Sequence, residues 1–218
     1  MIEIFDFDQG SPDWFACRLG LPTGSEYSTI LARGKDGGAS VTRRTYMLKL
    51  AGEIVSGLPM DSYTNAHMER GIIQEAEARD IYAFAHAEDT LTRVGFVRNG
   101  QTGCSPDALI GDKGVLEIKS ALAHILIGHL LKGDFPPEHK AQTQGALWVC
   151  EREFVDIAIY SPKLPLFVKR AVRDEPYIRD LAKAVADFNA ELAETVEKVR
   201  RYGAPSTLKS DLKLSLVK

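Results

Sequence analysis

The segment GCSPDALIGDKGVLEIKS, residues 103–120, contains an acid and a base two residues apart in an otherwise apolar run. Side chains at positions i and i+2 of a strand project from the same face, so Glu117 and Lys119 point together. Such a face is one of two things. It is either a solvated edge carrying a surface ion pair, or a site where acid and base act on one group.

A second acid, Asp107, precedes the predicted strand DALIG. Gly111 and Gly114 bound a tight connection that should fold VLEIK back as the antiparallel partner of that strand. The hairpin then brings Asp107 toward Glu117, and two close carboxylates repel each other unless a cation neutralises them. Oxygen ligands favour magnesium or manganese over zinc. The alternative is that Asp107 only starts a turn.

A third acid comes from RGIIQEAEAR, within a helix predicted over residues 65–87. Two acids of this segment, Glu75 and Glu77, each share a helical face with apolar residues. The faces comprise Met68, Ile72, Ala78 and Tyr82 for Glu75, and Ile73, Ile81 and Phe84 for Glu77. Because both faces are apolar, periodicity does not decide which acid is buried.

The composition indicates a globular protein, since 218 residues with 44% hydrophobic content can bury a sizeable core. We expect one domain over residues 1–203 and a tail over 204–218. No apolar run approaches the roughly 20 residues of a membrane span, and the acidic start MIEIFDFDQG does not resemble a secretory signal. These features predict a cytoplasmic protein without a membrane partner. Widely spaced Cys17, Cys104 and Cys150 are interpreted as packing residues.

The net charge of −3 gives no global attraction to nucleic acid, so a DNA-binding surface would need cations gathered locally. One N-terminal stretch holds few acids and several cations that could form such a surface: Arg18, Arg33, Lys35, Arg43 and Arg44. The alternative is that each of them is an ordinary solvated side chain.

The pattern of elements predicts a mixed sheet with helices packed over it. Helices are expected from Ser11–Pro12, from Thr23–Ser25, and over residues 41–57, 65–87, 136–150 and 175–202. Strands are expected over residues 93–97, 107–112, 115–120, 154–160 and 166–172. The last helix carries an amphipathic stripe expected to lie in the core: Ile178, Leu181, Val185, Phe188, Leu192 and Val196.

SPD, followed ten residues after its Asp by LEIK, resembles the PD-(D/E)xK nuclease signature. The surrounding motifs resemble the phage lambda exonuclease and YqaJ-type viral recombinase branch of that superfamily. They occur in the family's order between residues 11 and about 160: WFACRLGLPTGSE, RGIIQEAEAR, GCSPD, LEIKS and AQTQGALWV. The resemblance implies an α/β (α+β) fold with a restriction-endonuclease-like core, a central mixed β-sheet flanked by helices.

The resemblance also implies roles for individual residues. It implies metal ligands at Asp107, Glu117 and the backbone carbonyl of Ile118, and it places Glu75, by its spacing from Gly71, toward a second ion. The implied cofactor is two magnesium ions, which manganese can replace. Lys119 matches the catalytic lysine, and Gln142 matches a polar helix residue facing the site. A further acid expected upstream of SPD has no match in RVGFVRNGQ.

The N-terminal motif implies a site for a terminal phosphate. Hydroxyl and backbone N–H groups of Thr23, Gly24 and Ser25, with Arg18, suit an anion, although TGS alone is equally a helix cap. The family places one more cation after this helix, and Lys35 holds the equivalent spacing, with Arg33 as its neighbour. Met68 matches an apolar wedge that separates DNA strands, with core packing as the alternative.

The function implied is a magnesium-dependent 5′→3′ exodeoxyribonuclease that digests one strand of linear double-stranded DNA from a 5′-phosphorylated end. Its products would be mononucleotides and a 3′ overhang for phage-type recombination. The family implies a ring of three identical subunits, a single-strand annealing protein as partner, and the cytoplasm of a bacterial host. The alternatives are a PD-(D/E)xK endonuclease of restriction or repair type, and a catalytically inactive DNA-binding module.

Overall fold

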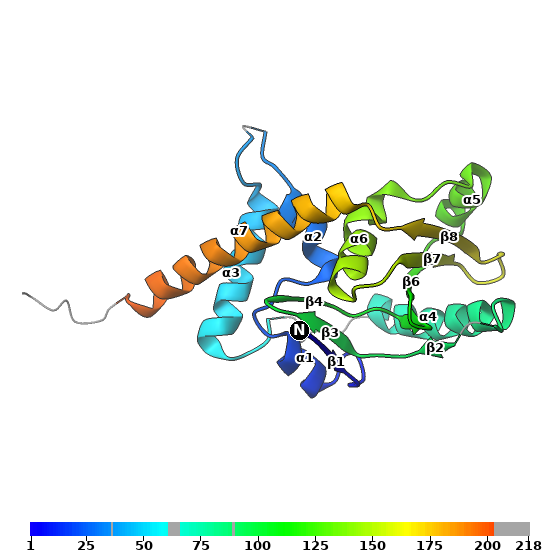
Figure 1. The fold of residues 1–218 in the computed structure, drawn as a ribbon, viewed down its shortest axis with the longest axis horizontal. Helices are drawn as coiled ribbons and strands as arrows, with labels where there is room; N and C mark the ends of the chain where they lie inside the picture. Colours follow the sequence, from blue (N-terminus) through cyan, green and yellow to red (C-terminus); the bar gives the residue numbers. More distant parts are fainter. Residues whose placement is uncertain (36, 61–65, 89, 203–218) are drawn as a thin grey trace, which may run out of the picture.

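A computed structural model describes residues 1–35, 37–60, 66–88 and 90–202. It is a mixed α/β structure with two sheets flanked by helices, and the longest helix runs out from the body toward the C-terminus (Figure 1). This architecture confirms the predicted fold class. The predicted tail, residues 204–218, lies outside the described residues.

Seven α-helices and two 3₁₀ turns occur in the part of the chain that the structure describes. The helices are α1 (Pro12–Arg18), α2 (Tyr27–Leu31), α3 (Val41–Ser56), α4 (Ala66–Ala85), α5 (Ala123–Lys132), α6 (Lys140–Val149) and α7 (Glu175–Arg200). The turns are η1 (Gly24–Glu26) and η2 (Pro137–His139). Local capping explains several starts: the Ser40 hydroxyl, for example, accepts from the Arg43 N–H and opens α3, which ends at left-handed Gly57.

The strands form a three-stranded and a five-stranded sheet. The first has the order β1 (Ile2–Phe5), β3 (Phe96–Asn99), β4 (Thr102–Cys104). The second has the order β2 (Leu91–Thr92), β5 (Ala108–Ile110), β6 (Gly114–Ser120), β7 (Phe154–Tyr160), β8 (Phe167–Val172). Only the β6–β7 pairing is parallel among those described, so the predicted mixed sheet is confirmed.

The predicted hairpin is formed by β5 and β6. Ala108 lies opposite Leu116, and the Asp107 N–H donates to the Leu116 carbonyl at 3.1 Å, which extends the ladder by one residue. The chain then crosses from β6 to the parallel strand β7 through α5, η2 and α6. This crossover places α6 over the sheet, where it contacts both β6 and β7.

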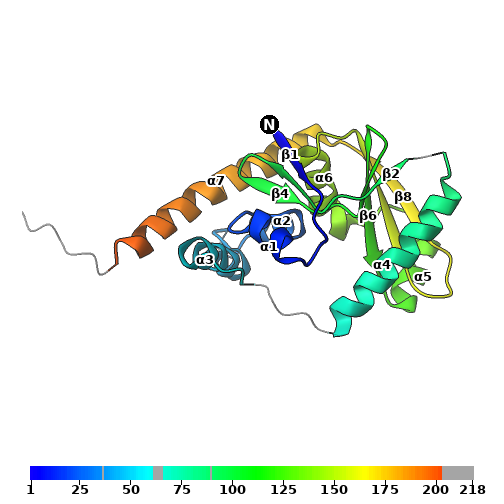
Figure 2. The ribbon, with the colours of Figure 1, turned by 90° about the horizontal axis from the view of Figure 1, so that it is seen from below.

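The core confirms the predicted stripe of α7. All six of its residues are buried within the main hydrophobic cluster: Ile178, Leu181, Val185, Phe188, Leu192 and Val196. Cys104 and Cys150 belong to the same cluster, with 3.5 Å between their sulfur atoms, as expected of packing residues. A second cluster forms between α4 and the five-stranded sheet, beside which α4 runs in Figure 2.

Four elements lie outside those predicted from the sequence, namely α5, β1, β2 and β4. Helix α5 begins after Leu122 without a side-chain cap, so its sequence has no start signal. Strand β1 is fixed by pairing with β3, more than ninety residues away in the chain. Neither feature depends on local sequence, which explains why local patterns miss them.

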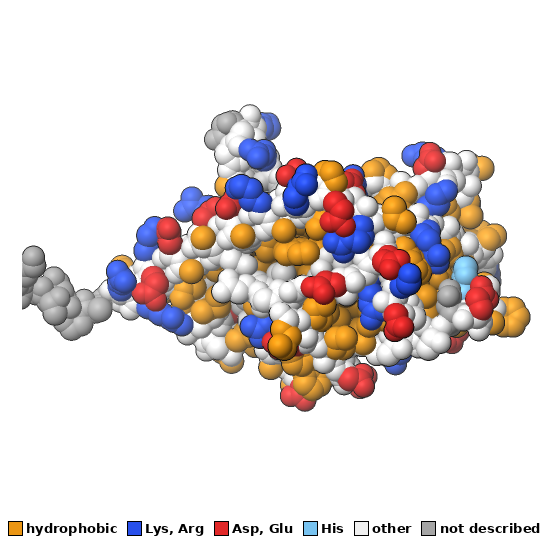
Figure 3. All heavy atoms as spheres, in the orientation of Figure 1, with side chains coloured by type: hydrophobic (Ala, Val, Ile, Leu, Met, Phe, Trp, Pro, Cys, Tyr) orange, Lys and Arg blue, Asp and Glu red, His pale blue; other side chains and the backbone are white. Residues whose placement is uncertain are grey.

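The surface carries charges of both signs. On the face shown in Figure 3, Lys and Arg side chains are interspersed with Asp and Glu, as the small net charge of −3 implies. Arg43, one of the cations considered for DNA binding, is held in a two-pronged pair with Glu191 of α7 at 2.8 Å. Within the described ranges, no helix has the length and apolar character needed to cross a membrane.

Candidate active site

The two acids of the hairpin lie next to each other where β5 begins and β6 passes its midpoint. Asp107 Oδ2 accepts from the Ile118 N–H at 2.5 Å. Glu117 is buried, and its Oε1 accepts from Lys119 Nζ at 2.7 Å and from Gln142 Nε2. The structure therefore brings together four predicted site residues from the SPD turn, β6 and α6.

The electrostatics of this cluster are dominated by burial and by the repulsion between the Asp107 and Glu117 carboxylates. Burial and then the Glu117 carboxylate raise the pKa of Asp107 to about 8. Burial would lower the pKa of Lys119, but the carboxylates, led by Glu117, outweigh it and raise that pKa. Lys119 is accordingly a cation at neutral pH and can donate hydrogen bonds. The raised pKa of Asp107 means that a further positive charge nearby would favour its ionised form.

Helix α4 presents Glu75, rather than Glu77, toward these acids. Ala78 and Tyr82 on the Glu75 side are fully buried against the sheet, whereas Glu77 accepts from the Tyr160 hydroxyl at 2.8 Å. Burial raises the pKa of Glu75, while Lys119 and Arg79 oppose this, so Glu75 lies within electrostatic reach of the site. The packing thus decides a question that periodicity left open.

Met68 also belongs to α4, but its side chain lies outside the described residues. Whether it faces DNA or the core therefore stays a prediction.

The donor set fits a magnesium ion that shares its coordination with substrate. Across residues 1–35, 37–60, 66–88 and 90–202, no three His, Cys, Asp or Glu side chains are placed to hold a metal on their own. Magnesium is usually held by one or two carboxylates, with water and phosphate oxygens completing the shell. Asp107 and Glu117 provide that number, and their mutual repulsion is the reason a cation would be favoured between them.

A separate cavity of about 70 Å³ lies beneath the N-terminal helices. Its polar lining includes the cations Arg18 and Lys49, the hydroxyl residues Thr23 and Ser25, and the acids Glu26 and Glu53. Arg18 Nη2 donates to the Thr23 hydroxyl at 3.2 Å, and its guanidinium stacks 4.1 Å from the centre of the Trp14 ring. Thr23 stands at the N-cap of η1 without a side-chain cap bond, so capping does not account for this residue.

The cavity and the acids are connected through the SPD turn. Thr23 forms a β-bridge with Gly103, and Trp14 Nε1 donates to the Ser105 hydroxyl at 2.9 Å. The two residues proposed as an extra cation, Arg33 and Lys35, are not among those lining the cavity. They lie exposed on the loop between α2 and α3, which projects from the body in Figure 1.

Sequence reasoning missed Trp14, and also residues that line the cavity, such as Tyr46 and Glu53. Trp14 touches both Arg18 and the SPD turn, yet a lone tryptophan within WFACR has no spacing that distinguishes it from a packing residue. Its indole N–H, bonded also to the Gly95 carbonyl at 3.0 Å, could only be placed once the sheet was known.

Comparisons with known proteins identify the fold and the family of this chain. The structure of LHK-Exo, described as an alkaline exonuclease from Laribacter hongkongensis, is similar at a TM-score of 0.79 and 30% identity, over 89% of this chain and 98% of that one. LHK-Exo in complex with dAMP gives a TM-score of 0.80 at the same identity and coverage. A phage-related exonuclease from Haemophilus somnus 129PT shares the fold, with a TM-score of 0.64, 13% identity, and 82% and 96% coverage. A search of curated protein sequences found no match. The family model for the YqaJ-like viral recombinase domain matches residues 13–153, and this chain belongs to that family.

Proposed function

We propose that this protein is a magnesium-dependent 5′→3′ exodeoxyribonuclease that digests one strand of linear double-stranded DNA from a 5′-phosphorylated end. The products would be mononucleotides and a 3′ overhang for phage-type recombination in a bacterial cytoplasm. One observation carries the proposal: the acid pair Asp107 and Glu117, with Lys119 bonded to Glu117, is linked through the SPD turn and Gly103 to Thr23, which lines the same cavity as Arg18. The resemblance to LHK-Exo, called an exonuclease, supports it.

The residues suit hydrolysis of a phosphodiester. Asp107, Glu117 and the Ile118 carbonyl would hold magnesium, or manganese in its place, with Glu75 directed to a second ion. Bound divalent ions lower the pKa of water and neutralise charge on phosphate. Lys119, protonated, donates a hydrogen bond to the attacking water or to a phosphate oxygen. Gln142 donates to the same Glu117 oxygen as Lys119 and so helps to fix the orientation of that carboxylate.

Linear and covalently closed circular duplexes should behave differently. With magnesium, the wild type should convert a linear 5′-phosphorylated duplex to mononucleotides and leave the closed circle intact, because digestion needs an end. EDTA should stop the reaction. Gel and chromatographic analysis of both substrates checks this. A cut circle would indicate the endonuclease alternative, and DNA bound but left whole with magnesium would indicate an inactive binding module.

The 5′-phosphate should matter through Arg18. Charge-assisted hydrogen bonds to phosphate contribute roughly 1.5 to 3 kcal/mol each, so a 5′-hydroxyl duplex should be digested at least about tenfold more slowly. Arg18→Ala should slow digestion of the phosphorylated duplex toward that rate, with much less effect on the hydroxyl duplex, whose partner group is already missing. Initial rates for the wild type and Arg18→Ala, each on the 5′-phosphate and the 5′-hydroxyl duplex, give the four measurements that this comparison needs.

Arg179→Ala provides the matched control, since this exposed arginine of α7 is outside the cavity lining. Equal wild-type rates on the two ends would remove the cavity from the mechanism.

The proposed ring of three subunits would bury apolar side chains that a single copy exposes. Ile73, Ile81 and Phe84 on α4 are between 43% and 89% exposed, and Leu131 on α5 is 83% exposed. Exposed apolar groups of this kind often mark an interface between proteins. Light scattering at micromolar concentration, which should give the mass of a trimer, tests the ring.

Calorimetric titration with a single-strand annealing protein tests that protein as a partner. Limited proteolysis tests the proposed single domain over residues 1–203.

A further inference from the structure

A second, larger cavity opens at the carboxyl ends of the parallel strands β6 and β7. Its volume is about 520 Å³, within the range of ligand-binding pockets. In open α/β sheets, ligands bind outside the carboxyl ends of parallel strands, where the crossover connection leaves a crevice. Lys119 lines this cavity and is bonded to Glu117, so the cavity adjoins the acid pair directly.

The lining of this cavity combines apolar and polar side chains. Leu122, Ile125 and Pro162 supply the apolar surface, while Gln74 of α4 and His129 and His139 supply the polar groups. Burial and the charge of Lys119 lower the pKa of His139, so its ring is neutral at neutral pH. Glu138, 3.6 Å from His129, adds negative charge at the rim. Apart from Lys119 at the boundary with the acid pair, this lining suits a flat heterocycle better than a phosphate.

The position of the cavity relative to the end pocket indicates what it would hold. The two share no lining residue. A chain of contacts separates them, running from Thr23 to Gly103, through the SPD turn to Asp107 and Ile118, and on to Lys119. A strand whose 5′-phosphate lies beside Arg18 and whose next phosphate lies over the acids would continue past Lys119 into this cavity.

We propose that the cavity binds the base and sugar of the second nucleotide of the digested strand, the nucleotide whose 5′-phosphate is attacked. This rests on the proposed function. Hydrolysis forms a bond from water oxygen to that phosphorus and breaks the bond to the 3′ oxygen of the first nucleotide, which takes up a proton. Lys119, at the boundary of the cavity and the acid pair, would then stand beside the phosphate under attack. The cavity thus holds the phosphate in line for attack.

Contacts to the face of a base are tolerant of sequence, because every base has such a face. The neutral His139 ring and the adjoining apolar wall therefore suit an enzyme that must accept each nucleotide in turn. The cavity would contribute to positioning without selecting a sequence.

Three duplexes test the proposal in single-turnover release of the first nucleotide. The first is unmodified, the second has a tetrahydrofuran abasic residue at position 2 of the digested strand, and the third has it in the complement opposite position 2. The second and third both lose the base pair, but only the second loses the base that the cavity would hold. We expect the wild type to be about tenfold slower on the second duplex than on the third.

His139→Ala should reduce that difference to less than about threefold by slowing the third duplex, whereas His124→Ala should retain it. His124 is an exposed histidine of α5 outside the cavity lining, which makes it the matched control. Equal wild-type rates on the second and third duplexes overturn the inference and leave the proposed function standing, and this comparison needs no variant to fold. A difference that His139→Ala leaves at full size also overturns it. A wild type that releases no nucleotide from any of the three overturns both.

Discussion

Asp107→Asn and Glu117→Gln should each reduce mononucleotide release by at least about a thousandfold, which corresponds to roughly 4 kcal/mol of lost transition-state stabilisation. Each change removes one of the two carboxylates that face each other across β5 and β6. DNA binding should persist, because it depends on surfaces other than the acid pair. Single-turnover digestion and fluorescence anisotropy with a labelled duplex in calcium measure the two properties separately.

Glu77→Gln is the matched control for this prediction. Glu77 is an acid of similar sequence context, but it accepts from the Tyr160 hydroxyl and is not among the charges that shift the pKa of Asp107 or Lys119, so its amide variant should keep nearly full activity. Magnesium-supported turnover at the wild-type rate in Asp107→Asn would eliminate the acid pair as the catalytic centre.

The effect of Asp107→Asn on stability can also be predicted, because its sign follows from the pKa of Asp107. The pKa of Asp107 is raised to about 8 in the fold, above its value in an unfolded chain, so the folded state retains a proton that the unfolded state loses. Stability contributed by this group is therefore present at low pH and is lost as the pH rises toward 8. In EDTA at pH 8, Asp107→Asn should melt no lower than the wild type, which separates lost chemistry from lost folding.

Asp156→Ala should lower the free energy of unfolding by about 2 to 4 kcal/mol, less than for a fully buried pair because Arg170 is half exposed. Asp156 is 2% exposed and accepts from the Tyr82 hydroxyl at 2.6 Å and from Arg170 Nε and Nη2 at 2.8 Å. Removing it leaves the buried Tyr82 hydroxyl without this partner. Thermal melts at constant pH, with a loss of roughly 5 to 15 °C, check the prediction.

Lys183→Ala serves as the control: it breaks a surface pair with Asp187 on α7 and should change stability by less than about 0.5 kcal/mol.

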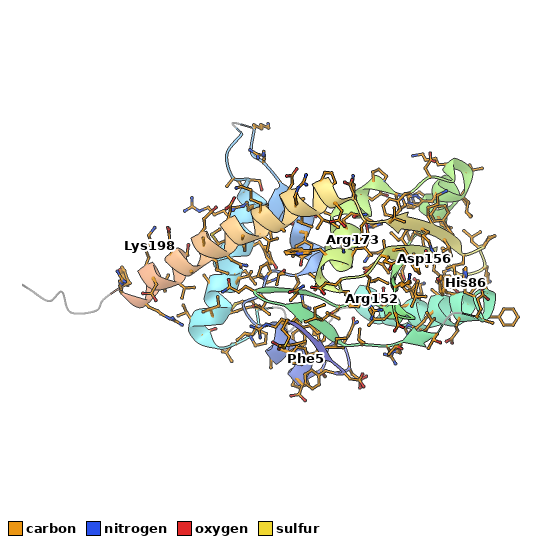
Figure 4. The ribbon with its side chains drawn as sticks, viewed as in Figure 1. Phe5, His86, Arg152, Asp156, Arg173 and Lys198 are labelled. Carbon is orange, nitrogen blue, oxygen red and sulfur yellow. The ribbon has the colours of Figure 1, made fainter. Side chains whose placement is uncertain are left out.

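Asp156, labelled in Figure 4, joins β7 to α4 through Tyr82, which also stacks on His86. Because α4 carries Glu75, Asp156→Ala should also slow digestion in the fraction that remains folded. An Asp156→Ala melt within 1 °C of the wild type would show that this buried carboxylate is not what holds α4 on the sheet.

Sequence patterns predicted those parts of the molecule whose geometry is local. The hairpin around Asp107 and Glu117 follows from a glycine-bounded turn, and the buried stripe of α7 follows from helical periodicity. The choice of Glu75 over Glu77 could not be made in this way, since Ile73, Ile81 and Phe84 give the exposed face of α4 an apolar character as well. The family resemblance selects Glu75, and in the structure packing against the sheet distinguishes the two faces.

Long-range contacts account for what the sequence left undetermined at the site. The bond from Gln142 to Glu117 joins residues 25 apart, and the one from Trp14 to Ser105 joins residues 91 apart. The larger cavity depends on α5, whose apolar sequence has no start signal, and on the end of β7. Such features arise from the crossover of the chain, and no short motif encodes them.

The residues that would recognise a DNA end and those that would cut it belong to different sheets. Thr23 is bridged to β4 of the three-stranded sheet, whereas Glu117 and Lys119 stand on β6 of the five-stranded sheet, and Ser105 and Pro106 alone connect β4 to Asp107 along the chain. For protein engineering, this separation means that the end pocket and the hydrolytic site are built on different elements, although one hydrophobic cluster packs the two sheets together. Substitutions meant to change which ends are accepted therefore belong among the exposed side chains of the N-terminal helices, away from that shared core.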